Sequence, residues 1–376
     1  MKTPLVWLFV LGVLGTAMPG WTQPSAPVIS PEINPDHTVT FRLLAPQAQR
    51  VQLQCEGIAA TNLLKDARGV WSFTSPPLEP DIYNYSFNVD GLRITDPNND
   101  ALEYNLQNNE SLLHIPGTNT LPWEVNNVPH GQLHQHFYQS TVAGDYRDFI
   151  VYTPPGYNPA AWKWYPVLYL LHGYSHDASS WSTVGCANII LDNLIARGEA
   201  RPMIVVMPLG YGDMKVVSRG RGALSGRGLL QASMDKFQLT LLQEVMPQVE
   251  KAYKASSDRE NIALAGLSMG GTESLLTGLN HLDRFSWIGC FSAGGLGPNF
   301  AQEFPKTGPK LNSELHLLWI SCGDHDNLLS SNRAFYDWIT SRGVTAKWVE
   351  IPGEHSFRVW RRNLADFAPL LFRDQH

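Results

Sequence analysis

The chain has 376 residues, enough for two domains, and 43% of them are hydrophobic, which provides ample apolar side chain for a large core. The formal net charge of -6 at pH 7 excludes a broadly basic surface, so we expect no nucleic-acid partner. The 12 His and four Cys form no C-x-x-C motif or His/Cys cluster, so the sequence predicts no metal and no cofactor.

The pattern of residues 1–26 is typical of a signal peptide. Lys2 precedes the apolar run Leu5–Leu14, and small residues follow up to Ala17. The run is too short to span a bilayer, and no cysteine follows it directly, so we expect no membrane or lipid anchor. The sequence therefore predicts export, with a secreted or periplasmic protein as the product.

Residues 27–116 show the two-residue alternation of β-strands. The alternating segments are Thr38–Leu44, Arg50–Gln54 and Tyr83–Val89, and turn-forming residues separate them. This spacing predicts a small immunoglobulin-like β-sandwich. It contains no Ser, His and acid constellation. A linker is expected at 117–133.

Residues 134–376 alternate between continuous apolar runs and helical stretches. The apolar runs lie at 165–171, 203–207, 262–265, 287–291 and 317–321, and the clearest helical stretches at 187–196 and 237–253. Continuous apolar strands that alternate with helices indicate a mostly parallel sheet covered on both faces. The predicted fold class is therefore an α/β domain preceded by a small all-β domain.

Gly266–Gly271 has the G-x-S-x-G pattern of a nucleophile elbow, with Ser268 at its centre. Such a turn is too tight for side chains at its flanks, which explains Gly266 and Gly270. A bare G-x-S-x-G also occurs by chance. Here an apolar strand precedes it and a helical pattern follows, and this context favours a nucleophilic serine.

A serine nucleophile needs a histidine base, and the histidine needs a carboxylate. Asp326 follows the apolar run 317–321, and Asp324 is its rival for the role of acid. His355 follows the next predicted strand and is the candidate base. The order Ser, acid, His is the order found in α/β-hydrolases.

Two backbone N–H groups, those of Tyr174 and Met269, are expected to stabilise the oxyanion. The side chains of Tyr174 and Trp181 are candidate substrate contacts. For Trp181, packing of the loop is an equal alternative. We expect His172 to brace this loop rather than to carry protons.

Together, the motifs at 152–157, 170–173, 187–196, 266–271 and 322–326 resemble the esterase D-like α/β-hydrolases, and within them carbohydrate esterase family 1. The resemblance covers about residues 129–372. It implies Ser268 as nucleophile, Asp326 as acid and His355 as base. Cys186, where related chains often have arginine, and the basic segment Met214–Leu230 depart from the family.

The N-terminal part, in Val39–Pro46, Gly69–Trp71 and Tyr83–Gly91, resembles E-set domains near the family-48 carbohydrate-binding modules. This resemblance implies the fold more firmly than it implies sugar binding.

The leading hypothesis is a secreted serine carboxylic ester hydrolase that removes feruloyl or acetyl groups from plant cell-wall polysaccharides, with an ester-substituted polysaccharide or oligosaccharide as its partner. Alternatives are an enterochelin-type siderophore esterase, for which the basic residues Lys215–Arg227 would suit an anionic substrate, a non-enzymatic carbohydrate-binding protein, and an acyltransferase. The acyl group, the sugar, the oligomeric state and the pairing of the cysteines stay open.

Overall fold

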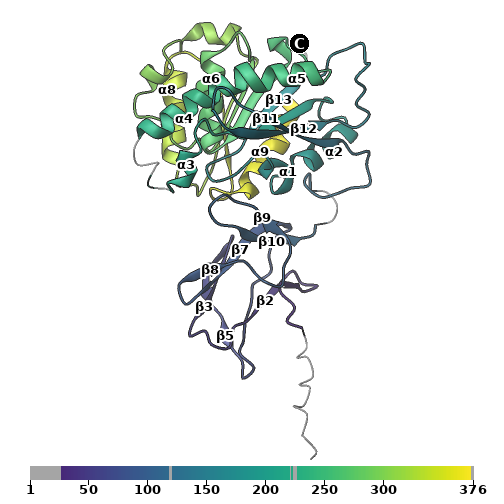
Figure 1. The fold of residues 1–376 in the computed structure, drawn as a ribbon, viewed down its shortest axis with the longest axis vertical. Helices are drawn as coiled ribbons and strands as arrows, with labels where there is room; N and C mark the ends of the chain where they lie inside the picture. The colour runs from purple at the N-terminus through teal and green to yellow at the C-terminus, as the bar shows by residue number, and fades with distance from the viewer. Residues whose placement is uncertain (1–26, 118–120, 221, 223–226, 374–376) are drawn as a thin grey trace, which may run out of the picture.

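The computed structural model describes residues 27–117, 121–220, 222 and 227–373. The predicted signal peptide at 1–26 lies outside the described residues. A β-rich part precedes a larger α/β part along the chain, and it lies against the end of the α/β part that carries helices α1 and α9 (Figure 1).

The β-rich part consists of two antiparallel sheets with the strand orders β1-β2-β6-β5 and β4-β3-β7-β10-β9, and β8 pairs with β7. Its strands are β1 (Glu32–Ile33), β2 (Val39–Leu44), β3 (Val51–Cys55), β4 (Ile58–Asn62), β5 (Leu64–Lys65), β6 (Val70–Thr74), β7 (Asp81–Val89), β8 (Leu92–Ile94), β9 (Leu102–Glu103) and β10 (Glu110–Ile115).

Strand alternation builds the core of this part. On β2, Val39, Phe41 and Leu43 are buried while the residues between them are partly exposed. Tyr85 on β7 meets Phe41 edge-on, with ring centroids 5.0 Å apart. The period of two in the sequence is therefore the period of a half-buried strand.

The α/β part is built on a sheet with the order β11-β12-β14-β13-β15-β16-β17-β18. β12 pairs antiparallel with both of its neighbours, β11 and β14. From β14 onward in this order, neighbouring strands pair in parallel. The strands are β11 (Gln132–Gln139), β12 (Tyr146–Thr153), β13 (Val167–Leu171), β14 (Ile204–Pro208), β15 (Ile262–Leu267), β16 (Trp287–Phe291), β17 (Leu317–Gly323) and β18 (Lys347–Ile351).

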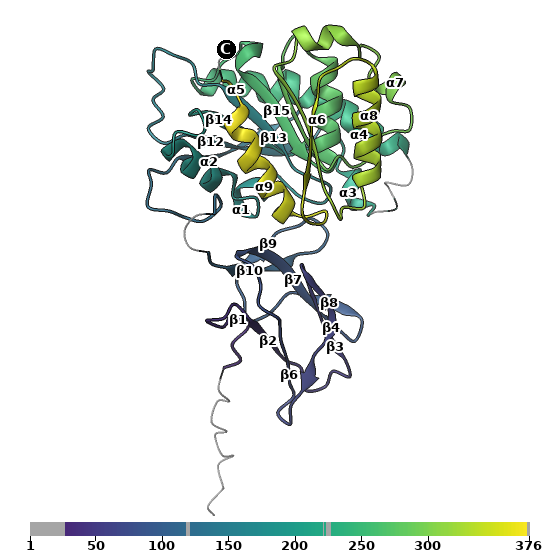
Figure 2. The ribbon, with the colours of Figure 1, turned by 180° about the vertical axis from the view of Figure 1, so that it is seen from behind.

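Helices cover both faces of this sheet (Figures 1 and 2). They are α1 (Ser180–Thr183), α2 (Ala187–Ala196), α3 (Lys215–Ser218), α4 (Arg227–Thr240), α5 (Met246–Ala252), α6 (Met269–Asn280), α7 (Phe300–Glu303), α8 (Leu329–Ser341) and α9 (Phe357–Phe367), with a π-helical turn at Leu241–Val245 and short 3-10 turns at Arg259–Asn261, Pro309–Ser313 and Ala368–Leu370.

Alternate residues of β13 point into two different cores. Leu168 and Leu170 pack with α2 and α9, whereas Val167, Tyr169 and Leu171 pack with the helical stretch that contains Phe237 and Val249. Burial on both faces explains why this strand is apolar throughout. The prediction of a mostly parallel α/β-hydrolase sheet after an all-β part is confirmed.

A buried ion-pair cluster joins the two parts. The carboxylate of Asp81, at the start of β7, pairs with three arginines of α9: Arg358 at 3.3 Å, Arg361 at 2.9 Å and Arg362 at 2.6 Å. The side chains of Asp81 and Arg361 are fully buried. Arg361 also donates to the carbonyl of Ile82 at 2.6 Å. The β-rich part is thus attached directly to the helix that follows the loop of His355.

Among the described residues, no helix is both long enough and apolar enough to cross a membrane.

Candidate active site

Ser268 lies in the tight turn between β15 and α6. Its backbone has φ 52° and ψ -117°, a conformation that is strained for a residue with a side chain. A Cβ atom on Gly266 would lie 2.5 Å from the carbonyl oxygen of Gly270, and one on Gly270 would lie 2.4 Å from that of His172. Glycine is therefore required on both sides of the serine, as the sequence pattern indicates.

His355 connects Ser268 to Asp326. The Nε2 atom of His355 lies 2.9 Å from the hydroxyl oxygen of Ser268, and Nδ1 lies 2.7 Å from a carboxylate oxygen of Asp326. With the proton on Nδ1, the ring donates to the carboxylate and accepts the serine hydroxyl proton at Nε2. The structure brings these three predicted residues together in one hydrogen-bonded chain, the geometry that a histidine base needs to activate a serine.

Asp326 and Asp324 have different surroundings. Asp326 is buried and also accepts the backbone N–H of Leu328 at 2.8 Å. Burial acts to raise the pKa of Asp326, but the hydrogen bond and charge of His355, together with the Leu328 N–H, outweigh it and lower this pKa. Asp326 is thus held as the charged partner of the histidine.

Asp324 is exposed, and the hydrogen bonds of its carboxylate go to residues other than His355. Its carboxylate accepts the N–H of Gly353 at 2.8 Å and lies 2.6 Å from Nδ1 of its neighbour His325. The Gly353 N–H lowers the pKa of Asp324. Asp324 therefore ties the loop after β17 to the loop that carries the histidine.

The loop after β13 approaches the nucleophile closely. A Cβ atom on Gly173 would lie 3.1 Å from the Cβ of Ser268. Within the described part of the chain, neither the N–H of Tyr174 nor that of Met269 donates to another residue. Within the described residues, the two predicted oxyanion donors therefore have no hydrogen-bond acceptor.

His172 braces this loop. Its Nδ1 lies 2.8 Å from the carbonyl oxygen of Gly173, and its Nε2 accepts the N–H of Gly210 at 2.8 Å. Burial lowers the pKa of His172 to about 4, so the ring is neutral near pH 7. A neutral ring fixed at both nitrogens supports the backbone, as expected, and has no free nitrogen for proton transfer.

A cavity of about 210 Å³ opens beside Ser268, and both parts of the chain line it. The α/β part contributes Gly173, Tyr174, Ser175, His176, Leu267, Ser268, His355, Ser356, Phe357 and Trp360, and the β-rich part contributes Glu56, Asn84, Glu103, Asn105 and Glu110.

Tyr174, the other candidate substrate contact, lines the cavity. Gln107 of the β-rich part donates to the Tyr174 hydroxyl at 2.8 Å, and this hydroxyl donates to the carbonyl of Val216 at 3.3 Å. Its ring is therefore fixed from both sides.

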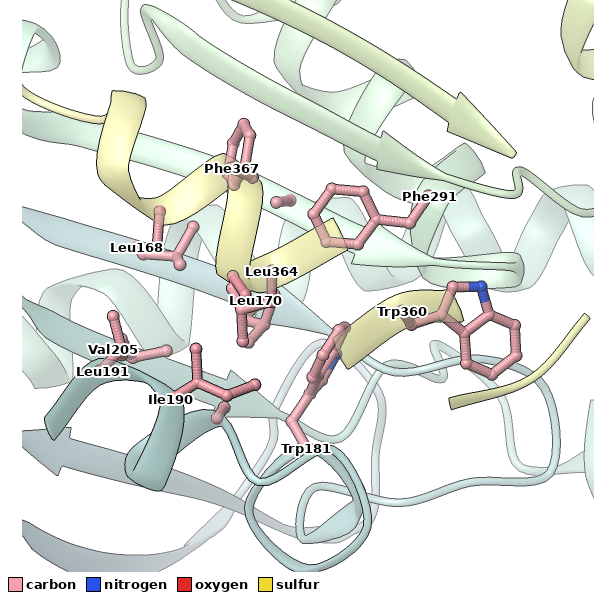
Figure 3. Packing of buried hydrophobic residues seen from close by; sticks show 14 of the residues in the cluster. Leu168, Leu170, Trp181, Ile190, Leu191, Val205, Phe291, Trp360, Leu364 and Phe367 are labelled. Carbon is pink, nitrogen blue, oxygen red and sulfur yellow. The ribbon is translucent and has the colours of Figure 1, made fainter. Parts of the chain in front are cut away.

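The prediction that Trp181 contacts substrate is wrong. Its side chain is fully buried, and its indole N–H donates to the carbonyl of Leu171 at 2.9 Å. Figure 3 shows the indole among the core side chains between α2, α9 and the sheet. It packs edge-on against Phe357, with ring centroids 5.7 Å apart. Phe357 borders the cavity, so Trp181 contacts this lining residue from the core side.

No local pattern in the sequence indicates the wall that comes from the β-rich part. Its polar residues lie on different strands and turns, and only the docking of the two parts brings them to Ser268. The wall is held by a hydrogen bond between Glu103 and His176, whose Oε1 and Nε2 atoms are 2.7 Å apart. Asn105 adds a hydrogen bond to the Ser175 hydroxyl at 3.0 Å.

The described residues contain no group of three or more His, Cys, Asp or Glu side chains that could hold a metal ion. All four cysteines are buried and unpaired. Of the basic segment, Lys215 and Arg219 do not line the cavity, Arg221 lies outside the described residues, and the side chain of Arg227 is not described.

Comparison with known proteins agrees with this architecture. The model of the Esterase family matches residues 140–371. A curated relative, the endo-1,4-beta-xylanase/feruloyl esterase of Xylanibacter ruminicola, is 31% identical over 352 residues, which cover 91% of this chain and 46% of that protein. The chain spans about half the length of the curated relatives it matches first, 46% and 57%.

Two solved structures are similar in fold. A ferulic acid esterase is 25% identical, covers 65% of this chain and 98% of its own, and superposes with a TM-score of 0.53. The enterobactin esterase of Shigella flexneri is 20% identical, covers 88% of this chain and 92% of its own, and gives a TM-score of 0.67. With the family match over residues 140–371, these findings show that the chain belongs to the Esterase family of α/β-hydrolases.

Proposed function

We propose that this chain is a serine carboxylic ester hydrolase that removes feruloyl or acetyl groups from plant cell-wall polysaccharides. The observation that carries the proposal is the hydrogen-bonded chain from Ser268 through His355 to Asp326 at the wall of a cavity. The xylanase/feruloyl esterase relative supports the substrate class.

In the proposed mechanism, the Ser268 oxygen attacks the ester carbonyl while His355 takes the hydroxyl proton. The charged carboxylate of Asp326 stabilises the imidazolium that forms. The N–H groups of Tyr174 and Met269 donate to the oxyanion. The tetrahedral intermediate collapses, the C–O bond to the alcohol breaks, and His355 gives its proton to the leaving oxygen.

The second half of the cycle removes the acyl group from Ser268. His355 takes a proton from water, the water oxygen attacks the acyl carbonyl, and the carboxylic acid leaves as the Ser268 hydroxyl regains the proton. Tyr174, Phe357 and Trp360 border the cavity, and their rings suit the aryl group of a feruloyl ester better than they suit acetyl alone.

The cavity disfavours the siderophore alternative. Its described lining includes Glu56, Glu103 and Glu110 but no lysine or arginine. Burial acts to raise the pKa of Glu103, but its hydrogen bonds to His176 and Asn84 outweigh burial and lower this pKa, so the carboxylate is charged and repels an anionic catecholate but not a neutral sugar ester. The likeness to the enterobactin esterase therefore concerns the fold. A non-enzymatic binding protein would have no need of the Ser268–His355–Asp326 chain.

Export and domain division belong to the same proposal. It assigns residues 1–26 to a signal peptide, which makes the protein secreted or periplasmic. It further assigns 27–116 to the E-set-like domain, 117–133 to the linker and 134–376 to the esterase domain.

The test is an assay of the protein on methyl ferulate, feruloylated arabinoxylo-oligosaccharide and acetylated xylan, with Ser268→Ala as the control. The expected result is release of ferulate or acetate by the wild type only. Absence of release from all three esters would contradict the proposal. Accumulation of a transferred ester in place of free acid would indicate an acyltransferase.

A further inference from the structure

The cavity beside Ser268 has two chemically different walls. One wall, from the α/β part, carries the nucleophile and the base. The other, which we call the acidic wall, comes from the β-rich part and consists of Glu56, Asn84, Glu103, Asn105 and Glu110. The acidic wall has no part in the proposed chemistry, so its role needs a separate explanation.

We propose that the acidic wall is the subsite for the alcohol portion of the ester, and that Glu56 and Asn84 accept hydrogen bonds from sugar hydroxyls there. This inference rests on the proposed esterase function and names the side of the substrate that the β-rich part recognises.

The direction of proton transfer places the alcohol on this side. His355 must reach the leaving oxygen in order to protonate it, so the alcohol lies next to His355. Glu56 interacts with the side chain of Ser356, the residue that follows His355. The acidic wall therefore begins where the leaving group departs.

The hydrogen bonds within the wall show which acceptors are free. The side-chain amide of Asn84 donates to Glu103 and, at 3.3 Å, to Glu110. Its backbone N–H donates to Oε2 of Glu56 at 3.1 Å. The carboxylate of Glu103 is hydrogen-bonded to His176, and that of Glu110 forms an ion pair with Arg93. Within the described residues, Oδ1 of Asn84 receives no hydrogen bond, and the Glu56 carboxyl is engaged only by the Asn84 N–H and the Ser356 side chain, so both groups keep lone pairs that can accept from a ligand.

His176 supplies an independent indication of a polar ligand. The residue is 8% exposed and lines the cavity, and its Nε2 is engaged by Glu103. Its Nδ1 is buried and has no hydrogen-bond partner among the described residues. A buried polar atom without a partner is costly, and a hydroxyl in the cavity would provide the missing partner.

The wall is held rigidly relative to the base. Asp81 anchors β7, the strand of Asn84, to three arginines of α9. Helix α9 begins at Phe357, two residues after His355. A subsite tied to the helix that directly follows the general acid is preorganised, so binding does not need to order it.

The experiment compares two esters with the same acyl group: feruloylated arabinoxylo-oligosaccharide and methyl ferulate. The readout is the ratio of their kcat/KM values, since this ratio cancels effects on the acyl side. For Glu56→Ala and Asn84→Ala we expect the ratio to fall about tenfold, which corresponds to the loss of about 1.4 kcal/mol of hydrogen bonding. Glu56→Gln, which keeps an acceptor oxygen, should retain most of the ratio.

The matched control is Glu79→Ala. Glu79 is an exposed glutamate of the β-rich part that does not line the cavity. The ratio of kcat/KM values for this variant should equal that of the wild type. A ratio within about twofold of wild type in both Glu56→Ala and Asn84→Ala would overturn the subsite, even if both rates fell together. The wild-type rates report separately on the proposed function. If one alanine variant fails to fold, as judged by thermal unfolding, the other and Glu56→Gln decide.

Discussion

The two parts of this chain contribute to one cavity in different ways. In the α/β part, Ser268, Asp326 and His355 each stand in a loop directly after a parallel strand, so one edge of the sheet assembles them. In the β-rich part, Asn84 and Glu103 lie within strands, and docking onto α9 brings them to the site. The proposed chemistry is thus encoded in local motifs, whereas the proposed recognition of the alcohol depends on how the two parts pack.

The largest expected effect concerns the α/β part alone. Ser268→Ala and His355→Ala should each lower kcat by about 10³-fold or more, because each removes a member of the proposed triad. The measurement is steady-state hydrolysis of an aryl ester by variants whose circular dichroism matches that of the wild type. Near-normal activity in either folded variant would refute the proposed mechanism.

The second prediction separates the two aspartates. Asp326→Asn should lower kcat by at least about 10²-fold, since the amide cannot stabilise the imidazolium as a carboxylate does. Asp324→Asn is the matched control, because its carboxylate binds Gly353 and His325 instead of His355. Measurement of both variants on one ester decides the assignment. The reverse ranking would make Asp324 the acid.

The third prediction targets the attachment between the two parts. Asp81→Ala leaves the fully buried Arg361 without its carboxylate and should reduce the free energy of unfolding by about 3–5 kcal/mol. Urea unfolding measures it, with the exposed Asp100→Ala as control. Equal stability of the two variants would mean that the cluster does not hold the parts together.

The smallest effect concerns Glu273 on α6, behind the nucleophile. Both carboxyl oxygens are buried without a partner among the described residues, and burial raises the pKa of Glu273 well above its usual value. The unfolded chain releases this proton above about pH 4.3 while the folded chain retains it, so the wild type loses stability as pH rises from there.

Glu273→Gln cannot ionise and should therefore gain stability relative to the wild type as pH rises above that value, with no added gain below it. Denaturant unfolding of both proteins across this pH range is the measurement. A stability difference independent of pH would show that Glu273 keeps its ordinary pKa.

Much of the fold was predictable because its strands are short apolar runs: the predicted run at 287–291 is β16, and the predicted helix at 187–196 is α2. The elbow was predictable because only glycine fits at 266 and 270. Trp181 could not be placed, since an aromatic residue after the loop of Tyr174 suits a pocket and a core equally well. Its burial depends on where α9 packs.

The acidic wall could not be predicted for a related reason. Glu56 and Asn84 are 28 residues apart in the chain, and the pairing of β3 with β7 brings them together. Their position beside His355 depends further on the ion pairs of Asp81. Neither the sheet register nor the docking of the two parts leaves a local pattern in the sequence.

The central claim, that Ser268 is the nucleophile, is tested most directly by covalent labelling with a fluorophosphonate. The esterase activity and the mass of each peptide are followed over time in the wild type and in Ser268→Ala. We expect one label on the peptide that contains Ser268, a loss of activity in proportion to labelling, and no label in the variant. A label on another residue that accompanies inactivation, or full activity after complete labelling of Ser268, would contradict the claim.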